Sequence, residues 1–192
     1  MRIAQLYPNI IFKELIMIYR YSRPAFMAAA LLLAGIASAA QSGALAKGDR
    51  TFIEKAAQGG IAEVELGNLA QQKAQNQQVK DFAARMVKDH SKANDELKSI
   101  ASAKGVTVPA EMDKSAVKEK EKLEKLEGAR FDREYMGHMV KDHKKDVKEF
   151  AKEARNAKDS DVKNFAATTL PTLQEHLNLA QAAERAAKSQ PK

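Results

Sequence analysis

The stretch MVKDH occupies residues 86–90 and is repeated without change at residues 139–143. In both copies the methionine and the histidine stand four residues apart, a spacing that places two side chains on one face of an α-helix. An aromatic residue, Phe82 or Tyr135, precedes each methionine by four residues and extends the same face. The repeat therefore predicts two helices that each carry one histidine within an otherwise apolar stripe.

The residues around each copy continue this stripe at intervals of three or four, which alternate regularly around the first copy. Around the first copy they are Val79, Ala83, Met86, His90, Ala93, Leu97 and Ile100. Around the second copy they are Phe131, Tyr135, Met139, His143, Val147, Phe150 and Ala154. Spacing of this kind is typical of helices that bury one face in a bundle.

The composition agrees with a helical protein whose core is built from small and aliphatic side chains. Aromatic residues make up 6% of the 192 residues, there is no tryptophan, and glycine and proline number only 9 and 5. The chain has no cysteine, which excludes disulfides and thiolate ligands. Any metal ion would have to be held by histidine, carboxylate or methionine.

We predict an all-α fold, a four-helix bundle of ferritin-like topology. The expected helices are 49–75, 76–104, 113–126, 129–157 and 160–187, of which the third is short and charged. Asp49 is expected to cap the first helix, and Gly105 is expected to follow the last residue of the second. Gly59 and Gly60 mark a kink or a close contact in the first helix. The long connection between the second and third long helices, which contains the short helix, should cross the length of the bundle, so that these two helices run parallel.

The first 40 residues have the pattern of a secretory leader. Arg20 and Arg23 precede an apolar run from Ala25 to Ile36, and the small residues Ala37, Ser38 and Ala39 follow it. We expect cleavage after residue 39 or 40 and export to the periplasm or the outer membrane; an uncleaved anchor is the alternative. The expected segments are 1–16 as an upstream extension, 17–40 as the signal peptide, 41–48 as a flexible lead-in, 49–187 as the bundle and 188–192 as a polar tail.

The charges of the chain do not indicate a nucleic-acid-binding protein. The whole chain has a net charge of +7. Four basic residues and one acidic residue lie in the leader, so the remainder has a net charge of +4. The run KEKEKLEKLE at 118–127 alternates in sign, as solvated helix faces do. A basic patch with interleaved aromatic residues is missing from the sequence. We expect no stable membrane span in the mature chain and at most a weak association with envelope surfaces. The sequence does not identify a protein partner.

Four segments carry a resemblance to a known family. They are FIEKAAQGGIAEVELGNLAQQKA, FAARMVKDHSKANDELKSIASAKGV, FDREYMGHMVKDHKKDVKEFAKEA and FAATTLPTLQEHLNLA. They lie within residues 51–183, the range over which the chain resembles the DUF4142 family of exported or outer-membrane bacterial proteins. The resemblance implies a ferritin-like helical bundle and export, and it implies no particular reaction.

The chemistry of the predicted bundle depends on four polar residues, one on each long helix. They are Glu65, His90, His143 and His176. Counted from the expected turns, they lie at similar depths if the long connection crosses the bundle, within about 6 Å along the axis. We predict that they form one buried layer. Three histidines and one carboxylate would suit a single zinc or copper ion. His138 has charged neighbours on its helix and is expected to be exposed.

Other interpretations of these residues remain open. Met86 and Met139, each one turn from a histidine, favour a soft site for Cu(I) instead. A di-iron centre would need Glu-x-x-His on two helices, and the sequence has valine or leucine at that position before each histidine. Haem bound by methionine and histidine has no further support. The layer could also be purely structural, in a non-catalytic structural or stress-protective envelope protein. We predict no catalytic residue. An enzyme is therefore the less favoured class.

Overall fold

The computed structural model describes residues 45–190, and within this range it contains five helices and no strand. The helices are α1 (Lys47–Lys73), α2 (Gln77–Ala103), α3 (Lys114–Glu124), α4 (Gly128–Asn156) and α5 (Ser160–Lys188). The all-α class is confirmed, and the predicted helix ends fall within two residues of the observed ones. The predicted extension and signal peptide lie outside the described residues.

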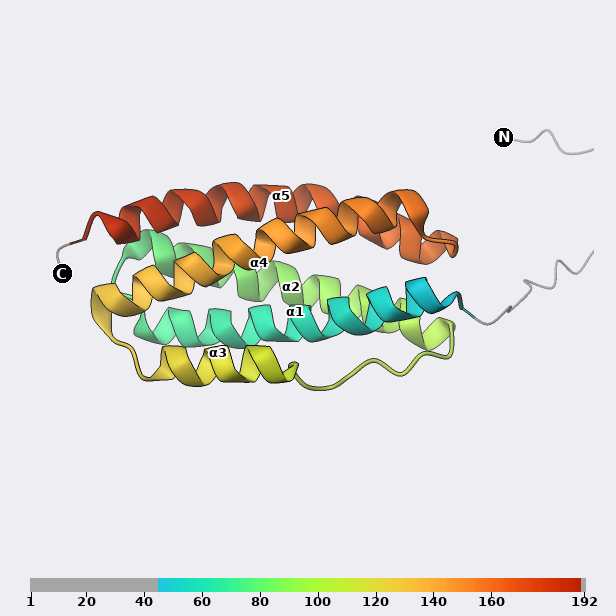
Figure 1. Cartoon of the computed structure of the whole chain (residues 1–192), viewed down its shortest axis with the longest axis horizontal. Coiled ribbons are helices and arrows are strands. Elements are labelled where there is room, and N and C mark those ends of the chain that lie inside the picture. The colour runs from blue at the N-terminus through green and yellow to red at the C-terminus, as the bar shows by residue number, and fades with distance from the viewer. Residues whose placement is uncertain (1–44, 191–192) are drawn as a thin grey trace, which may run out of the picture. The chain divides into compact units, whose positions relative to one another are not determined.

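The four long helices form two hairpins, α1 with α2 and α4 with α5, packed against each other (Figure 1). Bonds at the two ends of the bundle establish the helix directions. The backbone N–H of Asn76, at the start of α2, donates to Asp132, near the start of α4. Lys104, just past the end of α2, pairs with Asp159 at the start of α5. Helices α2 and α4 therefore run in the same direction, and residues 104–113 return along the bundle before α3 begins (Figure 1).

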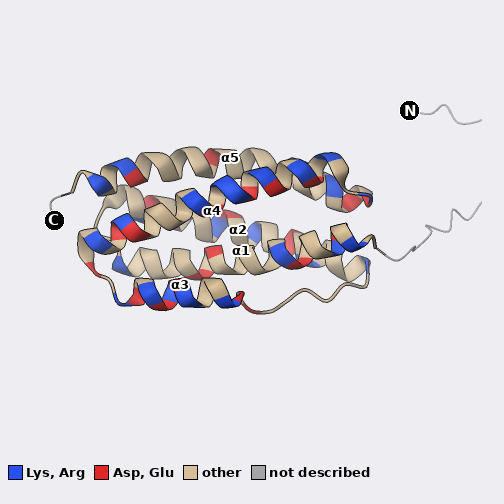
Figure 2. Ribbon diagram, viewed as in Figure 1, with Lys and Arg blue, Asp and Glu red and all other residues tan. Residues whose placement is uncertain are grey.

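The short helix α3 lies on the outside of the bundle against α1. Its Leu123 is fully buried, and its Lys120 and Lys122 pair with Glu65 of α1 and Glu134 of α4. Basic and acidic residues are interspersed along the outer faces of all five helices (Figure 2), as the sequence pattern predicts. Of the helices in residues 45–190, none is long and apolar enough to cross a bilayer.

Local bonds at the helix ends explain where the chain turns. Gly105 has a φ of +65° and its N–H donates to Ser102, while the N–H of Val106 donates to Ala101 at 2.8 Å. These two bonds close the end of α2, and only glycine adopts that φ at little cost, so the predicted role of Gly105 is confirmed. The prediction for Asp49 is wrong, because α1 begins two residues earlier and its cap residue is Ala46.

Asp49 and Asp132 instead bind each hairpin to the other. Asp49 of α1 is buried and accepts the N–H groups of Lys158 and Asp159 in the turn between α4 and α5. Asp132 of α4 is fully buried and accepts the N–H groups of Gln75 and Asn76 in the turn between α1 and α2. Each hairpin thus supplies the carboxylate that satisfies the backbone of the other hairpin's turn.

The bundle has two apolar clusters, one toward each end, and a polar layer between them. One cluster contains Leu66, Met86, Met139 and Ala180, and the other contains Ala57, Leu97, Phe150 and Leu173. On every long helix one buried polar residue falls between its members of the two clusters. These residues are Glu63, His90, His143 and His176. The apolar clusters thus exclude water from both sides of this layer.

Two glycines let α1 approach α2 closely. A Cβ at Gly60 would lie 1.9 Å from Oδ1 of Asn94, and a Cβ at Gly67 would lie 2.9 Å from the Val87 side chain and 3.1 Å from the carbonyl oxygen of Ala83. The sequence left a kink or close packing open at Gly59 and Gly60. The structure shows close packing at Gly60 within an unbroken helix.

Replacing Gly67 with alanine is expected to destabilise the fold by about 1–3 kcal/mol, because the added methyl group presses on a backbone carbonyl that cannot rotate away. Gly59→Ala is the matched control on the same helix. No atom lies within 4 Å of its added Cβ among the described residues, so it should gain about 0.5–1 kcal/mol from helix propensity. Urea unfolding midpoints of the two variants measure the difference, and equal effects would contradict the close contact.

Candidate metal centre

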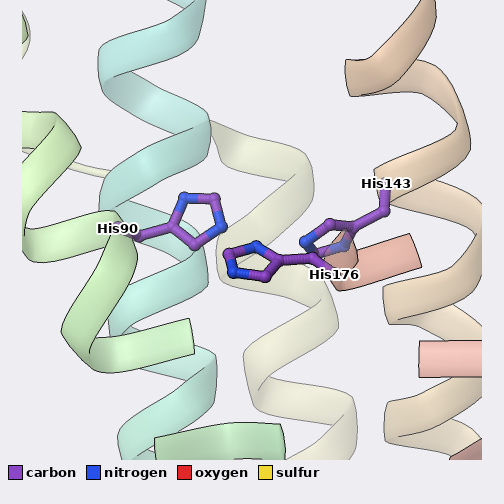
Figure 3. Close-up of side chains that lie close together, drawn as sticks. All are labelled: His90, His143 and His176. Carbon is purple, nitrogen blue, oxygen red and sulfur yellow. The ribbon is translucent and has the colours of Figure 1, made fainter. Parts of the chain in front are cut away.

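Three histidines from three helices converge in the polar layer. His90 comes from α2, His143 from α4 and His176 from α5, and their rings face one another between the helices (Figure 3). The ring centroids are 5.8, 5.4 and 5.5 Å apart. One ring nitrogen of each histidine lies within 4.8 Å of the other two. Exposed fractions of 8%, 0% and 1% place all three inside the bundle.

The hydrogen bond of His143 determines which of its nitrogens is free. Its Nδ1 lies 2.9 Å from the carbonyl oxygen of Met139, one turn earlier on α4. A carbonyl only accepts, so Nδ1 carries the proton and Nε2 carries the lone pair. Nε2 is buried and has no hydrogen-bond partner among residues 45–190.

His176 is oriented in the same manner by a carboxylate. Its Nε2 lies 3.0 Å from Oδ2 of Asp89, which also accepts a hydrogen bond from Arg85. Burial opposes the ionised form of Asp89, but these two donors outweigh it and lower the pKa of its carboxyl. Nε2 of His176 is therefore the donor, and its Nδ1 carries the lone pair. This Nδ1, like Nε2 of His90, is buried without a partner in the described part of the chain.

The environment keeps all three imidazoles neutral. Burial, reinforced by the neighbouring histidines, lowers the pKa of His90 to about 3, and mainly burial lowers the pKa of His143 to about 4. Burial also lowers the pKa of His176, against the opposing effect of Asp89. Neutral imidazole is the form that coordinates a metal ion.

The predicted fourth member of the layer, Glu65, lies elsewhere. Its side chain is 44% exposed and its carboxylate pairs with Lys120 of α3 at 2.7 Å. Glu63, two residues earlier, is the buried carboxylate of α1, with 1% of its surface exposed. The structure therefore brings together three of the four predicted residues and replaces Glu65 with Glu63.

The error has a physical cause in how α1 packs. The large residues Ile61 and Leu69, which suggested that Glu65 faced inward, are only half-buried. Apart from Leu66, the buried face of α1 on either side of Glu63 is formed by small residues, because this helix lies close to α2. They are Ala57, Gly60, Gly67 and Ala70, and Glu63 continues their spacing of three and four. This run of small residues was the signal that could have identified Glu63.

Glu63 is not placed among the three free nitrogens. Its Oε1 lies 3.8 Å from Nδ1 of His143, the nitrogen already bonded to Met139. Both carboxylate oxygens are buried with no hydrogen-bond partner among the described residues. Burial, followed by the charges of Asp142 and Asp146, raises the pKa of Glu63 well above its ordinary value. Burial and Glu63 likewise raise the pKa of Tyr135, whose hydroxyl is also unpartnered within residues 45–190.

Glu63 belongs to a second group of potential ligands, formed with Asp142 and Asp146 of α4. One oxygen from each of these carboxylates lies within 4.8 Å of the other two. The two aspartates are half-buried, and burial together with Asp142 raises the pKa of Asp146 to about 7. Asp142 holds the same position in the repeated MVKDH as Asp89, so the aspartate before each histidine is the signal in the sequence that marks both contacts.

The other residues singled out from the sequence take different positions. Met86 and Met139, the candidate soft ligands, are fully buried in the apolar cluster that adjoins the layer. His138 is half-buried on α4 rather than exposed. The arrangement as a whole presents three neutral imidazoles, each with one buried nitrogen unpartnered among residues 45–190, a set that suits borderline transition metals, and beside it three oxygen donors.

Comparisons with solved structures identify proteins with a similar fold. CopM in its Cu(II)-bound form has a TM-score of 0.61 and 18% identity, covering 71% of this chain and 95% of CopM. CopM in its Ag-bound form, with 20% identity and the same coverage, has a TM-score of 0.59. A conserved hypothetical protein from Mycobacterium tuberculosis, rv2844, has a TM-score of 0.52 and 18% identity, covering 76% of this chain and 94% of its own.

A search of curated protein sequences finds no match to the chain. The model of the family described as a domain of unknown function, DUF4142, matches residues 34–183. This match covers α1, α2 and α4 completely, α5 as far as residue 183, and the whole polar layer. The chain belongs to the DUF4142 family.

Proposed function

We propose that this protein binds one copper ion through His90, His143 and His176, and that zinc is the principal competing ion. The observation that carries the proposal is the set of three buried ring nitrogens, Nε2 of His90, Nε2 of His143 and Nδ1 of His176, none of which has a partner in residues 45–190. A buried polar atom without a partner costs about 1–3 kcal/mol. A single metal ion that accepted a lone pair from each of the three facing rings would satisfy all three nitrogens.

The other nitrogens of the layer support the same role. In many metal sites a ligating histidine donates its second N–H to a carboxylate or a backbone carbonyl, which fixes the tautomer and aims the lone pair. Asp89 does this for His176 and the carbonyl of Met139 does it for His143. Both rings are thus oriented before any ion arrives.

The donor set and the structural neighbours favour copper. Imidazole suits Cu, Zn, Ni and Fe, and among divalent ions of this series Cu²⁺ binds nitrogen sites most tightly. CopM, whose fold is similar, has been solved with Cu(II) and with Ag. The three donors leave a coordination position for a further ligand, and Met86 and Met139, each one turn from a layer histidine, are the nearest soft candidates along the sequence.

We further propose that the protein is exported and that it binds or buffers the ion in the cell envelope rather than catalysing a reaction. The leader pattern of residues 17–40 supports export. The parallel course of α2 and α4 supports a ferritin-like topology. That arrangement is what brings the two histidines of the repeated MVKDH to the same depth in the bundle.

Protein purified without a histidine tag is expected to bind one Cu(II) per chain. It should gain about 2.7 kcal/mol of stability when the free ion is at 100 times its dissociation constant. For a domain of this size, that gain corresponds to a rise in melting temperature of about 5–11 °C. His90→Ala and His143→Ala should abolish both the stoichiometric binding and the rise. Calorimetry and thermal unfolding, with and without the ion, measure these outcomes.

His138→Ala is the matched control, because it removes the remaining histidine of the chain from the same helix as His143. It should bind copper and melt as the unaltered protein does. The proposal would be refuted if neither Cu(II) nor Zn²⁺ changed the melting temperature of the unaltered protein. The layer would then serve only the fold, and His90→Leu should be tolerated or stabilising.

A further inference from the structure

We infer that Glu63, Asp142 and Asp146 form a second cation site, separate from the histidines, that takes a hard divalent cation such as Mn²⁺ or Ca²⁺. One carboxylate oxygen from each residue lies within 4.8 Å of the other two. The three side chains come from two helices, Glu63 from α1 and the aspartates from consecutive turns of α4. A cation between them would join α1 to α4.

The burial of Glu63 is what separates this cluster from ordinary acidic surface. Only 1% of Glu63 is exposed, and neither of its carboxylate oxygens has a hydrogen-bond partner among residues 45–190. A buried carboxylate is normally paired, hydrogen-bonded or bound to a metal, because removal from water is costly. At least one of these oxygens lies within 4.8 Å of an oxygen of each aspartate, an arrangement that a cation would stabilise and that other anions alone do not.

The cluster also has access to solvent. Asp142 is 26% exposed and Asp146 is half-buried, so the two aspartates lie between Glu63 and the surface of α4. Lys145 is largely exposed and stands 4.0 Å from Asp142, where it offsets part of the negative charge. A cation could therefore enter past the aspartates without displacing a helix.

The imidazole ring of His143 lies between the two donor sets. Its Nδ1 side carries the bond to Met139 and the 3.8 Å approach to Glu63, whereas its Nε2 has the lone pair assigned to copper. The two groups also differ in chemistry, because nitrogen donors suit copper and zinc while carboxylate oxygens suit Mg²⁺, Ca²⁺ and Mn²⁺. The second site is thus expected to bind without the first.

The test is a Mn²⁺ titration followed by electron paramagnetic resonance, in which binding removes the signal of the free aqueous ion. The full-length protein, free of copper, should bind one Mn²⁺ per chain at pH 7.5. Glu63→Gln and Asp146→Asn should each weaken this binding at least tenfold, since each replaces a carboxylate ligand with an amide of nearly the same shape. Glu65→Gln is the matched control on α1, and its Mn²⁺ affinity should be unchanged.

His90→Ala should also keep its Mn²⁺ affinity, and this variant separates the two sites. Loss of Mn²⁺ binding in His90→Ala would place the ion at the histidines and overturn the inference. It would also be overturned by an unaltered protein that leaves the Mn²⁺ signal intact, or by full binding in Glu63→Gln. Copper titration of the same samples reports the histidine site independently, so either site can fail alone, and melting curves without metal confirm that each variant is folded.

Discussion

At pH 5 the protein is expected to bind Cu(II) almost as tightly as at pH 7, with an affinity loss of less than about tenfold. Protons compete with metal ions for imidazole, and three exposed histidines with an ordinary pKa near 6.5 would lose about 10⁴-fold over this range. In the bundle, burial lowers the pKa of His90 to about 3 and of His143 to about 4, and it also lowers the pKa of His176. The lone pairs of these rings thus stay free of protons in mild acid.

The same shifts affect the stability of the metal-free protein. Because the folded pKa values of the histidines lie below those of the unfolded chain, the unfolded state takes up more protons as the pH falls through about 6.5. Their contribution to stability therefore declines toward acid. Glu63 and Asp146, whose folded pKa values are raised, contribute in the opposite direction, because the folded state keeps their protons as the pH rises.

Equilibrium dialysis against fixed concentrations of free Cu(II), at pH 7 and pH 5, measures the affinity directly. Circular dichroism at both pH values provides the control that the protein remains folded. A drop of a thousandfold or more in a protein that is still folded would show that the rings take up protons, and would contradict their burial. Absence of binding at pH 7 would instead count against the copper site itself.

Asp132→Ala is expected to cost about 3–5 kcal/mol, far more than an ordinary cap, because it removes a charged acceptor from two backbone donors, each worth about 1.5–3 kcal/mol. Asp132 is fully buried and accepts from Gln75 at 3.1 Å and from Asn76 at 2.9 Å. Once the side chain is gone, both N–H groups lose the carboxylate that accepts their hydrogen bonds. The turn between α1 and α2 then carries two unsatisfied donors.

The comparison for this variant is Asp113→Ala. Asp113 caps the exposed helix α3 through the N–H groups of Ser115 and Ala116, so its loss should cost about 1 kcal/mol. Urea unfolding at an unchanged m-value gives both free energies of unfolding. If Asp132→Ala costs no more than Asp113→Ala, the buried carboxylate does not hold the two hairpins together.

Much of the fold could be predicted because its signals are local. The regular stripes through His90 and His143 identify α2 and α4, and Gly105 marks the end of α2 through a backbone conformation that glycine adopts readily. Asp49 and Asp132 could not be assigned in this way. Their partners are backbone N–H groups more than 50 residues away, in turns whose position depends on the packing of the finished bundle.

The candidate site was predictable where large residues define the buried face of a helix. The residues that share a helix face with His90, His143 and His176 include large apolar side chains. These identify the buried face correctly, and all three histidines lie in the layer. On α1 the buried face around Glu63 is made mostly of glycine and alanine, so the half-buried Ile61 and Leu69 point to the wrong glutamate. Asp89 and Asp142 were missed because a charged residue on a helix usually faces solvent, and only the partner helix shows that each contacts the layer.

The burial of the three histidines also has a consequence for the rate at which an ion is exchanged. With apolar clusters on both sides and exposed fractions of 8% or less, an ion bound by all three rings can be exchanged only when helices separate. Asp49 and Asp132 hold the two ends of the bundle closed, so that separation is a collective opening, of the kind that takes microseconds to seconds. The rates of copper uptake and release should therefore match the rate of amide hydrogen exchange in α2 and α5, and should not reach the diffusion limit.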